Sequence, residues 1–159
     1  AQQAANLFAT LDASGKNFVM ILPNNDPGSD DIMSAINELP TDRFRILPSM
    51  RFSHFSELMK NAACIIGNSS AGVREAPFLS IPSLDVGTRQ NARAQSASIT
   101  SVRAQERDRI LDFLEQDWGK RYPANDDFGQ GSASERFVQI MGQDAFWQAK
   151  LQKAFVDHV

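Results

Sequence analysis

One stretch, Ile65–Pro77, constrains the fold of this chain more than any other. Apolar residues run up to Gly67, small polar residues follow, and helix-forming residues then lead to a carboxylate at Glu75. This order predicts a buried strand, a tight turn and the start of a helix. The first turn of a helix carries unpaired backbone N–H groups and the positive end of the helix dipole, so the turn is suited to bind a phosphate.

Several side chains in and after this stretch fit a phosphate or nucleotide site. Ser69 and Ser70 supply hydroxyl donors at the helix start, and Gly72 permits a close approach of the backbone. A second apolar run leads to Arg89, whose guanidinium is a permanent cation with a planar set of donors. The Glu75 carboxylate could accept hydrogen bonds from the hydroxyls of a sugar. The alternative is an ordinary strand-to-helix turn, and the residues by themselves leave both interpretations open.

The rest of the chain alternates between short apolar runs and segments with helical spacing. The apolar runs predict a strand at 18–22 that is buried on both faces, as in parallel sheets. Further strands are predicted at 44–47, 63–66, 83–86 and, from a weaker pattern, 97–100. Apolar residues on one helix face predict helices within 4–11, 32–39, 55–59, 110–118, 137–141 and 147–155. Strands and helices that alternate without repeats predict a doubly wound parallel α/β sheet, in a single domain over residues 1–159.

Four residues predict where individual helices begin or end. Ser53 is predicted to be an N-cap, and Ser132 with Glu135 has the spacing of a capping box. Pro77 has no backbone N–H group, so we expect its helix to kink or end nearby.

Ligands of doubly wound sheets bind beyond the carboxyl ends of the strands. We therefore expect four loops to gather at one edge of the sheet: 23–28, 48–53, 67–72 and 87–90. Phe55 opens the helix that follows the second of these loops and could stack on a base, although its spacing favours a place in the core. The backbone of 50–51 could pair with the edge of that base.

Composition excludes several classes of function. The net charge of −3 gives no electrostatic footprint for nucleic acid or for an anionic membrane surface. No apolar segment approaches the roughly 20 residues that span a bilayer. Neither a glycine-rich phosphate loop nor a dinucleotide-binding fingerprint occurs, and no cluster has metal-ligand spacing, so we expect no cofactor and no metal.

The single cysteine, Cys64, cannot form an internal disulfide, which is typical of a reducing cytoplasm. Because it lies in an apolar run, we expect a buried structural thiol and no nucleophile. The chain starts at Ala1 without a methionine, which is expected of a fragment more than of a complete protein.

Four segments together resemble the signature of the hydrolysing UDP-N-acetylglucosamine 2-epimerases. The first is the turn and helix at 67–77, the second is the segment from Gly87 to Gln90 with Arg93, and the third is the loop at 22–29. The fourth is the later region, which contributes 119–123 and 128–134. This family consists of sugar-nucleotide enzymes with two Rossmann-like halves, as in GT-B glycosyltransferases. The resemblance covers most of the chain. It implies a Rossmann-like C-terminal half that binds a UDP-sugar, and a separate N-terminal half as its partner.

The resemblance also implies a role for each candidate residue. By position, Ser69 and Ser70 hold the diphosphate at the helix start and Arg89 reaches the phosphates. Glu75 hydrogen-bonds the ribose and Phe55 packs on the uracil. The family's catalytic carboxylates and histidine belong to the other half, so we expect no catalytic residue within this chain.

Three residues depart from the family pattern. Asp85 stands where an asparagine is common, Ala92 where a glycine precedes Arg93, and Gln130 where an aspartate sits between two glycines. The last two could alter loop shape or specificity for the sugar, so the identity of the sugar stays open between UDP-N-acetylglucosamine and a diacetamido-trideoxy relative.

The family implies loss of UDP as the C2 proton is removed, followed by addition of water to release N-acetylmannosamine, the precursor of sialic acid. It also implies a homodimer when the protein is full length. Two alternatives stay open. One is the donor domain of a GT-B glycosyltransferase, for which Glu75 and Pro82 have the right spacing although Ser80 replaces the usual glycine. The other is a non-catalytic nucleotide-sugar-binding module.

Overall fold

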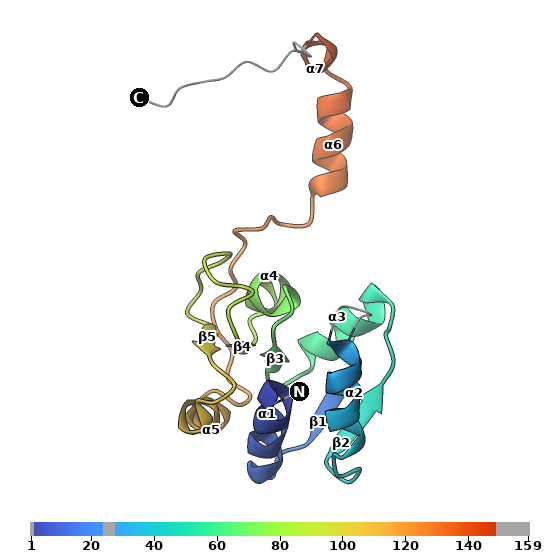
Figure 1. Cartoon of the computed structure of the whole chain (residues 1–159). Helices are drawn as coiled ribbons and strands as arrows, with labels where there is room; N and C mark the ends of the chain where they lie inside the picture. Colours follow the sequence, from blue (N-terminus) through green and yellow to red (C-terminus); the bar gives the residue numbers. More distant parts are fainter. Residues whose placement is uncertain (1, 24–27, 149–159) are drawn as a thin grey trace, which may run out of the picture. The chain divides into compact units, whose positions relative to one another are not determined.

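The computed structural model describes residues 2–23 and 28–148, and the chain divides into two compact units (Figure 1). The larger unit is Ala1–Asn125 and the smaller is Asp126–Val159. The predicted loop at 23–28 lies mostly outside the described residues, and so does most of the predicted helix at 147–155. None of the helices in the described ranges combines the length and apolar character needed to cross a bilayer.

The larger unit contains parallel strands that form two hydrogen-bonded groups. In the first group, β1 (Phe18–Ile21) pairs with β2 (Phe44–Leu47). In the second, β4 (Ser83–Val86) lies between β3 (Ile65–Gly67) and β5 (Ile99–Val102). Every one of these pairs is parallel, which confirms the predicted parallel α/β class.

Helices connect and cover the strands of this unit. They are α1 (Gln2–Ala13), α2 (Ser29–Asn37), α3 (Phe52–Lys60), α4 (Ala71–Phe78) and α5 (Arg107–Gln116). Helix α1 packs against α2 and α5, whereas α4 packs against β3, β4 and β5 (Figure 1). Helix α4 ends one residue after Pro77, as its missing N–H group predicts.

Apolar side chains fill two separate clusters, one on each face of β3. Ile66 packs on a cluster that includes Leu84 of β4 and Ile110 of α5. Ile65 packs on the other cluster, which includes Ala76 of α4. Because successive side chains of a strand point to opposite faces, this division means that β3 is buried on both faces. That is the arrangement of a doubly wound sheet.

Helix α4 lies very close to β4 at one point. A Cβ atom added to Gly72 would lie 2.7 Å from the Oγ atom of Ser83, and both residues are buried. Real Cβ atoms do not approach another atom so closely. The glycine is therefore needed on the side of α4 that faces the sheet.

The segment after α5 returns across the end of α4 as a strap, which we define as 119–125. Its backbone N–H groups donate to three carbonyl groups: Gly119 to Ala63 at 3.1 Å, Tyr122 to Ser80 at 3.0 Å and Asn125 to Pro77 at 3.1 Å. The Tyr122 hydroxyl donates to Asp117 at 2.6 Å. Carbonyls at a helix end have no partner within the helix, and the strap supplies one at the end of α4.

The predicted helix caps are wrong in detail. Ser53 lies inside α3, whose N-cap is Arg51, because the Phe55 N–H group already donates to the Arg51 carbonyl at 3.0 Å. Ser132 does precede its helix, but its φ of −92° and ψ of 23° are not extended, and its side chain makes no capping bond. Side-chain capping needs an extended N-cap residue. Strands β3 and β5 also begin two residues later than predicted, at Ile65 and Ile99.

The smaller unit contains α6 (Ala133–Met141) and α7 (Asp144–Trp147). Within the part of this unit that the structure describes, large apolar side chains are exposed, including Phe137, Val138 and Trp147. The Trp147 indole N–H donates to the Met141 carbonyl at 2.8 Å and so ties the two helices together.

The contact between Gly72 and Ser83 can be tested by substitution. We expect Gly72→Ala to lower the free energy of unfolding, because overpacking costs about 1–3 kcal/mol while alanine regains about 1 kcal/mol of helix propensity. In a Ser83→Ala background the same substitution should cost little or become stabilising, since the clashing Oγ atom is gone. Chemical denaturation of the four proteins measures this difference. An equal loss in both backgrounds would assign the cost to something other than Ser83.

Candidate functional site

The turn between β3 and α4 has the geometry that the sequence predicts. After Gly67 the chain passes through Asn68 and Ser69, and the Gly72 N–H group donates a turn bond to the Ser69 carbonyl at 3.1 Å. The first α-helical bond runs from the Arg74 N–H group to the Ser70 carbonyl at 2.9 Å. The Ser69 Oγ atom also accepts a hydrogen bond from the Ala71 N–H group at 3.3 Å. Ser69 is exposed and Ser70 is half-buried. The turn thus offers two hydroxyl groups at the start of a helix.

Parallel register brings the ends of three strands together beside this turn. Gly67 lies opposite Asp85 on β4, and Asp85 lies opposite Ser101 on β5. The loop that follows β4 therefore starts at the same edge as the turn after β3. This confirms that the 67–72 and 87–90 loops share one edge.

A side-chain hydrogen bond joins these two loops, and the sequence did not predict it. The Nε2 atom of Gln90 donates to the Asn68 carbonyl at 2.7 Å. Arg93 Nη1 donates to Gln90 Oε1 at 3.3 Å. Gln90 is only 3% exposed, although glutamine is normally a surface residue. Its only signal in the sequence is its place at the end of the segment that begins at Gly87.

The other residues predicted for the site differ in their exposure and in their contacts. Arg89 is exposed and directly precedes Gln90, so the bond to Asn68 holds its backbone near the turn. Phe55 of α3 is half-buried and packs on the cluster that contains Ala71, the first residue of α4. This contact agrees with the core position that its spacing favours. Gly72 is buried and faces Ser83, so its structural role lies on the sheet side.

Two carboxylates near this edge have buried oxygens. Glu75 Oε2 and Asp85 Oδ1 are shielded from solvent and have no hydrogen-bond partner among the described residues. Burial raises the pKa of the Asp85 carboxyl group, and a hydrogen bond from Ser101, 3.5 Å from Oδ2, opposes the rise. A buried acceptor without a partner is costly, so each of these two oxygens needs an explanation.

Cys64 and His54 do not contribute to this edge in the way a catalytic group would. Burial raises the pKa of the Cys64 thiol to about 12, and the side chain packs on the first core cluster. His54 is an exposed residue of α3. Within the described residues, no group of histidine, cysteine and acidic side chains gathers as a metal site would need.

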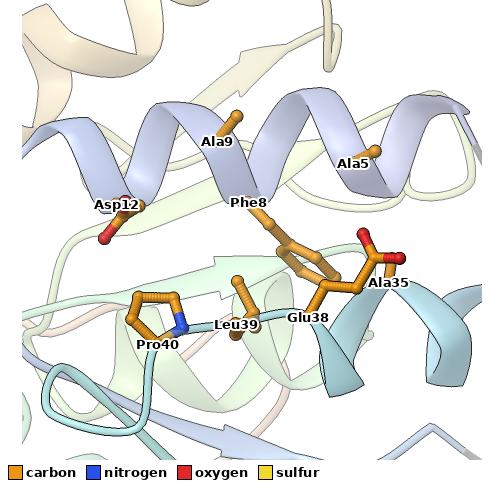
Figure 2. Close-up of a pocket in the computed structure, with 8 residues that line it drawn as sticks. All are labelled: Ala5, Phe8, Ala9, Asp12, Ala35, Glu38, Leu39 and Pro40. Carbon is orange, nitrogen blue, oxygen red and sulfur yellow. The ribbon is translucent and has the colours of Figure 1, made fainter.

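A pocket of about 210 Å³ lies elsewhere, between α1 and the end of α2 (Figure 2). Figure 2 shows the Phe8 ring directed from α1 toward Glu38 and Leu39. Asp12, also in its lining, forms an ion pair with Arg43 at 2.9 Å. Apolar walls with two carboxylates do not suit a diphosphate, and none of the predicted site residues lines this pocket.

Comparison with known protein sequences tests the resemblance to a family. The family model of UDP-N-acetylglucosamine 2-epimerase matches residues 1–142. A UDP-N-acetylglucosamine 2-epimerase of Neisseria meningitidis serogroup B is 39% identical, over 98% of this chain and 42% of that protein. The resemblance to this family is therefore confirmed.

Two further relatives are more distant. A UDP-N,N'-diacetylbacillosamine 2-epimerase (hydrolyzing) of Legionella pneumophila is 29% identical, over 81% of this chain and 34% of that protein. The polysialic acid biosynthesis protein P7 of Escherichia coli is 34% identical, over 54% of this chain and 22% of that protein. The chain thus spans less than half the length of each of these relatives.

The buried carboxyl group of Asp85 predicts a pH-dependent effect on stability. The pKa of this group is raised in the folded state, so the carboxyl group contributes to the stability of the fold below the unfolded pKa, about 3.9. That contribution to stability is lost as the pH rises through the pKa of the folded state. We expect Asp85→Asn to raise the free energy of unfolding at pH 8 by on the order of 1 kcal/mol, and this gain to shrink toward pH 4. Denaturant titrations at both pH values measure it. A loss of stability at pH 8 would mean that the carboxylate has a compensating partner.

Cys64 should be almost unreactive in the folded protein. A pKa of about 12 in place of 9.0 lowers the thiolate fraction at pH 8 about a thousandfold, and only the thiolate attacks. A coloured disulfide reagent should modify the native protein at least a hundredfold more slowly than the protein in denaturant. A rapid reaction of the native thiol would contradict the protonated state of this partly buried side chain.

Proposed function

Because the chain belongs to the UDP-N-acetylglucosamine 2-epimerase family, we propose that it forms the UDP-sugar-binding domain of a hydrolysing member. The observation that carries this proposal is the bond between Gln90 and Asn68. It joins the Gly67–Pro77 stretch and the Gly87–Gln90 segment, both of which resemble the signature of the hydrolysing epimerases. Both lie where parallel α/β sheets bind nucleotides.

In this proposal each candidate residue recognises one part of UDP. Ser69 and Ser70 bind the diphosphate at the start of α4, where the helix dipole adds positive potential. Arg89 approaches the phosphates from the neighbouring loop. Glu75 accepts hydrogen bonds from the ribose, and Phe55 packs on the uracil. Gly72 serves by letting α4 lie close to β4, as its distance to Ser83 supports.

The reaction that we propose for the whole protein begins with loss of UDP as the C2 proton of the sugar is removed. Water then adds to the unsaturated intermediate and releases N-acetylmannosamine. This domain would stabilise the negative charge that develops on the leaving diphosphate, through Arg89 and the helix start. We assign no catalytic residue to this chain, so the base and the acid would come from the other half of the protein.

We propose UDP-N-acetylglucosamine as the substrate, on the strength of the Neisseria relative. The name of the Legionella relative supports UDP-N,N'-diacetylbacillosamine as a second candidate. A role in sialic acid production, a cytoplasmic location and a homodimer at full length complete the proposal. The E. coli polysialic acid protein supports the first of these, and the single free cysteine suits the second.

Titration of UDP into the protein at its full natural length tests the site. We expect Arg89→Ala to raise the Kd about 10- to 100-fold, because a charge-assisted contact contributes about 1.5–3 kcal/mol. Arg45→Ala is the matched control, since Arg45 is an exposed arginine on β2. Isothermal titration calorimetry measures both. Equal Kd values for Arg89→Ala and wild type would remove Arg89 from the site.

Ser70→Ala should also weaken UDP binding, through loss of a hydroxyl donor. Cys64→Ala serves as its control, because the Cys64 side chain packs on the core and should affect only stability. If the two variants lost the same affinity, partial unfolding would explain the effect better than a phosphate contact. A separate experiment decides between the two candidate substrates: activity assays of the full-length protein with UDP-N-acetylglucosamine and with UDP-N,N'-diacetylbacillosamine.

A further inference from the structure

Arg93, Gln90 and the Asn68 carbonyl form a continuous chain of hydrogen bonds, which we call the Arg93–Gln90 relay. We propose that this relay positions the diphosphate-binding turn, with Gln90 and Arg93 acting as positioning residues that do not themselves touch UDP. The inference rests on the proposed function and extends it. It assigns two residues that give the turn its binding conformation.

The chemistry of the three groups sets the orientation of the Gln90 amide. A guanidinium only donates hydrogen bonds and a backbone carbonyl only accepts them. Arg93 must therefore meet Gln90 Oε1, which leaves the amide NH₂ group directed at the Asn68 carbonyl. The reversed amide would place two donors together and two acceptors together. Arg93 thus acts on the turn through Gln90.

The bond to Asn68 also sets the direction of the next amide group. A trans peptide is planar, and its C=O and N–H groups point in opposite directions. When the Asn68 carbonyl faces Gln90, the Ser69 N–H group in the same peptide plane points away from it. Gln90 therefore determines where the turn presents a backbone donor, immediately before the start of α4.

The relay is built into a tight loop, and Gln90 at its centre is shielded from water. The Arg93 N–H group donates to the Gln90 carbonyl at 3.1 Å, and Ala92 between them has a φ of +60°. Such a conformation is costly for alanine and persists where the surroundings demand it. Gln90 is 3% exposed, so water does not compete well for its bond to Asn68. The bond also anchors the backbone next to Arg89, so one residue holds both phosphate-binding loops.

Gln90→Glu separates the two halves of the relay. The carboxylate has nearly the same shape as the amide and still accepts a hydrogen bond from Arg93, but at neutral pH it cannot donate to the Asn68 carbonyl. We expect this variant to raise the Kd for UDP at least tenfold, measured by calorimetry with full-length protein well below its melting temperature. Tyr122→Phe is the matched control, because it removes another part-buried side-chain bond, to Asp117, which involves neither the turn nor the 87–90 loop. It should lower the melting temperature and leave the Kd within twofold.

Arg93→Met tests the relay without placing a charge at residue 90, which is buried. Because Arg93 is exposed, we expect the fold to tolerate this substitution. We expect a three- to tenfold rise in Kd. Adding Arg93→Met to Gln90→Met should raise the Kd little further, because both act through the same bond. Multiplying effects would show that Arg93 contacts UDP itself and would overturn the relay.

The titration of the wild-type protein separates the two proposals. Absence of UDP binding to wild type overturns the proposed function, and with it the relay that rests on it. Binding by wild type together with an unchanged Kd in Gln90→Glu overturns the relay alone. Equal losses of affinity in Gln90→Glu and Tyr122→Phe would likewise reduce Gln90 to a general stabilising contact.

Discussion

The parallel pairing of β3, β4 and β5 is the constraint on which the candidate site depends. Because the strands run in the same direction, Gly67, Asp85 and Ser101 lie side by side, and the chain leaves β3 and β4 at one edge. Ile65 and Ile66 pack on opposite core clusters, so a shift of one residue would exchange two buried faces. Core packing therefore also sets which residue ends β3 and where the turn begins.

Helix α4 is held at both ends by groups from distant parts of the chain. At its start, Gln90 binds the Asn68 carbonyl of the preceding turn. At its end, the strap donates to the Pro77 and Ser80 carbonyls. A short helix that contains proline gains little stability from its own hydrogen bonds. The bond from Gln90 and the close packing at Gly72 hold the start of the helix, whereas the strap holds its end.

The electrostatics of this edge divide along α4. The helix start has positive potential and serine hydroxyl groups, which suit a diphosphate. Glu75 lies about one turn later, and its shielded Oε2 atom has no partner within the described residues. An acceptor set back from the helix start suits a ligand that carries hydroxyl groups beyond its phosphates, as a nucleotide does. The local chemistry along α4 thus suits the nucleotide that we propose as its ligand.

Local patterns in the sequence were sufficient for the class of fold and for most of its elements. The runs at 44–47 and 83–86 coincide with β2 and β4. The prediction that 18–22 is buried on both faces is wrong, since Val19 of β1 is 46% exposed, and Ile46 of β2 is exposed as well. The weak run at 97–100 placed β5 two residues too early. The motif at 67–77 also predicted the turn and the start of α4 correctly. Glycine permits the turn, and a serine hydroxyl can bond the backbone within a few residues, so this signal is local.

Contacts between distant residues were decided only by the tertiary structure. Whether Ser53 or Ser132 caps a helix depends on backbone angles that the surrounding packing imposes. The need for Gly72 follows from its approach to Ser83. The burial of Gln90 follows from the meeting of two loops. A sequence specifies hydrogen-bonding groups and apolar surface, but a partner on another strand becomes adjacent only after the parallel sheet has formed.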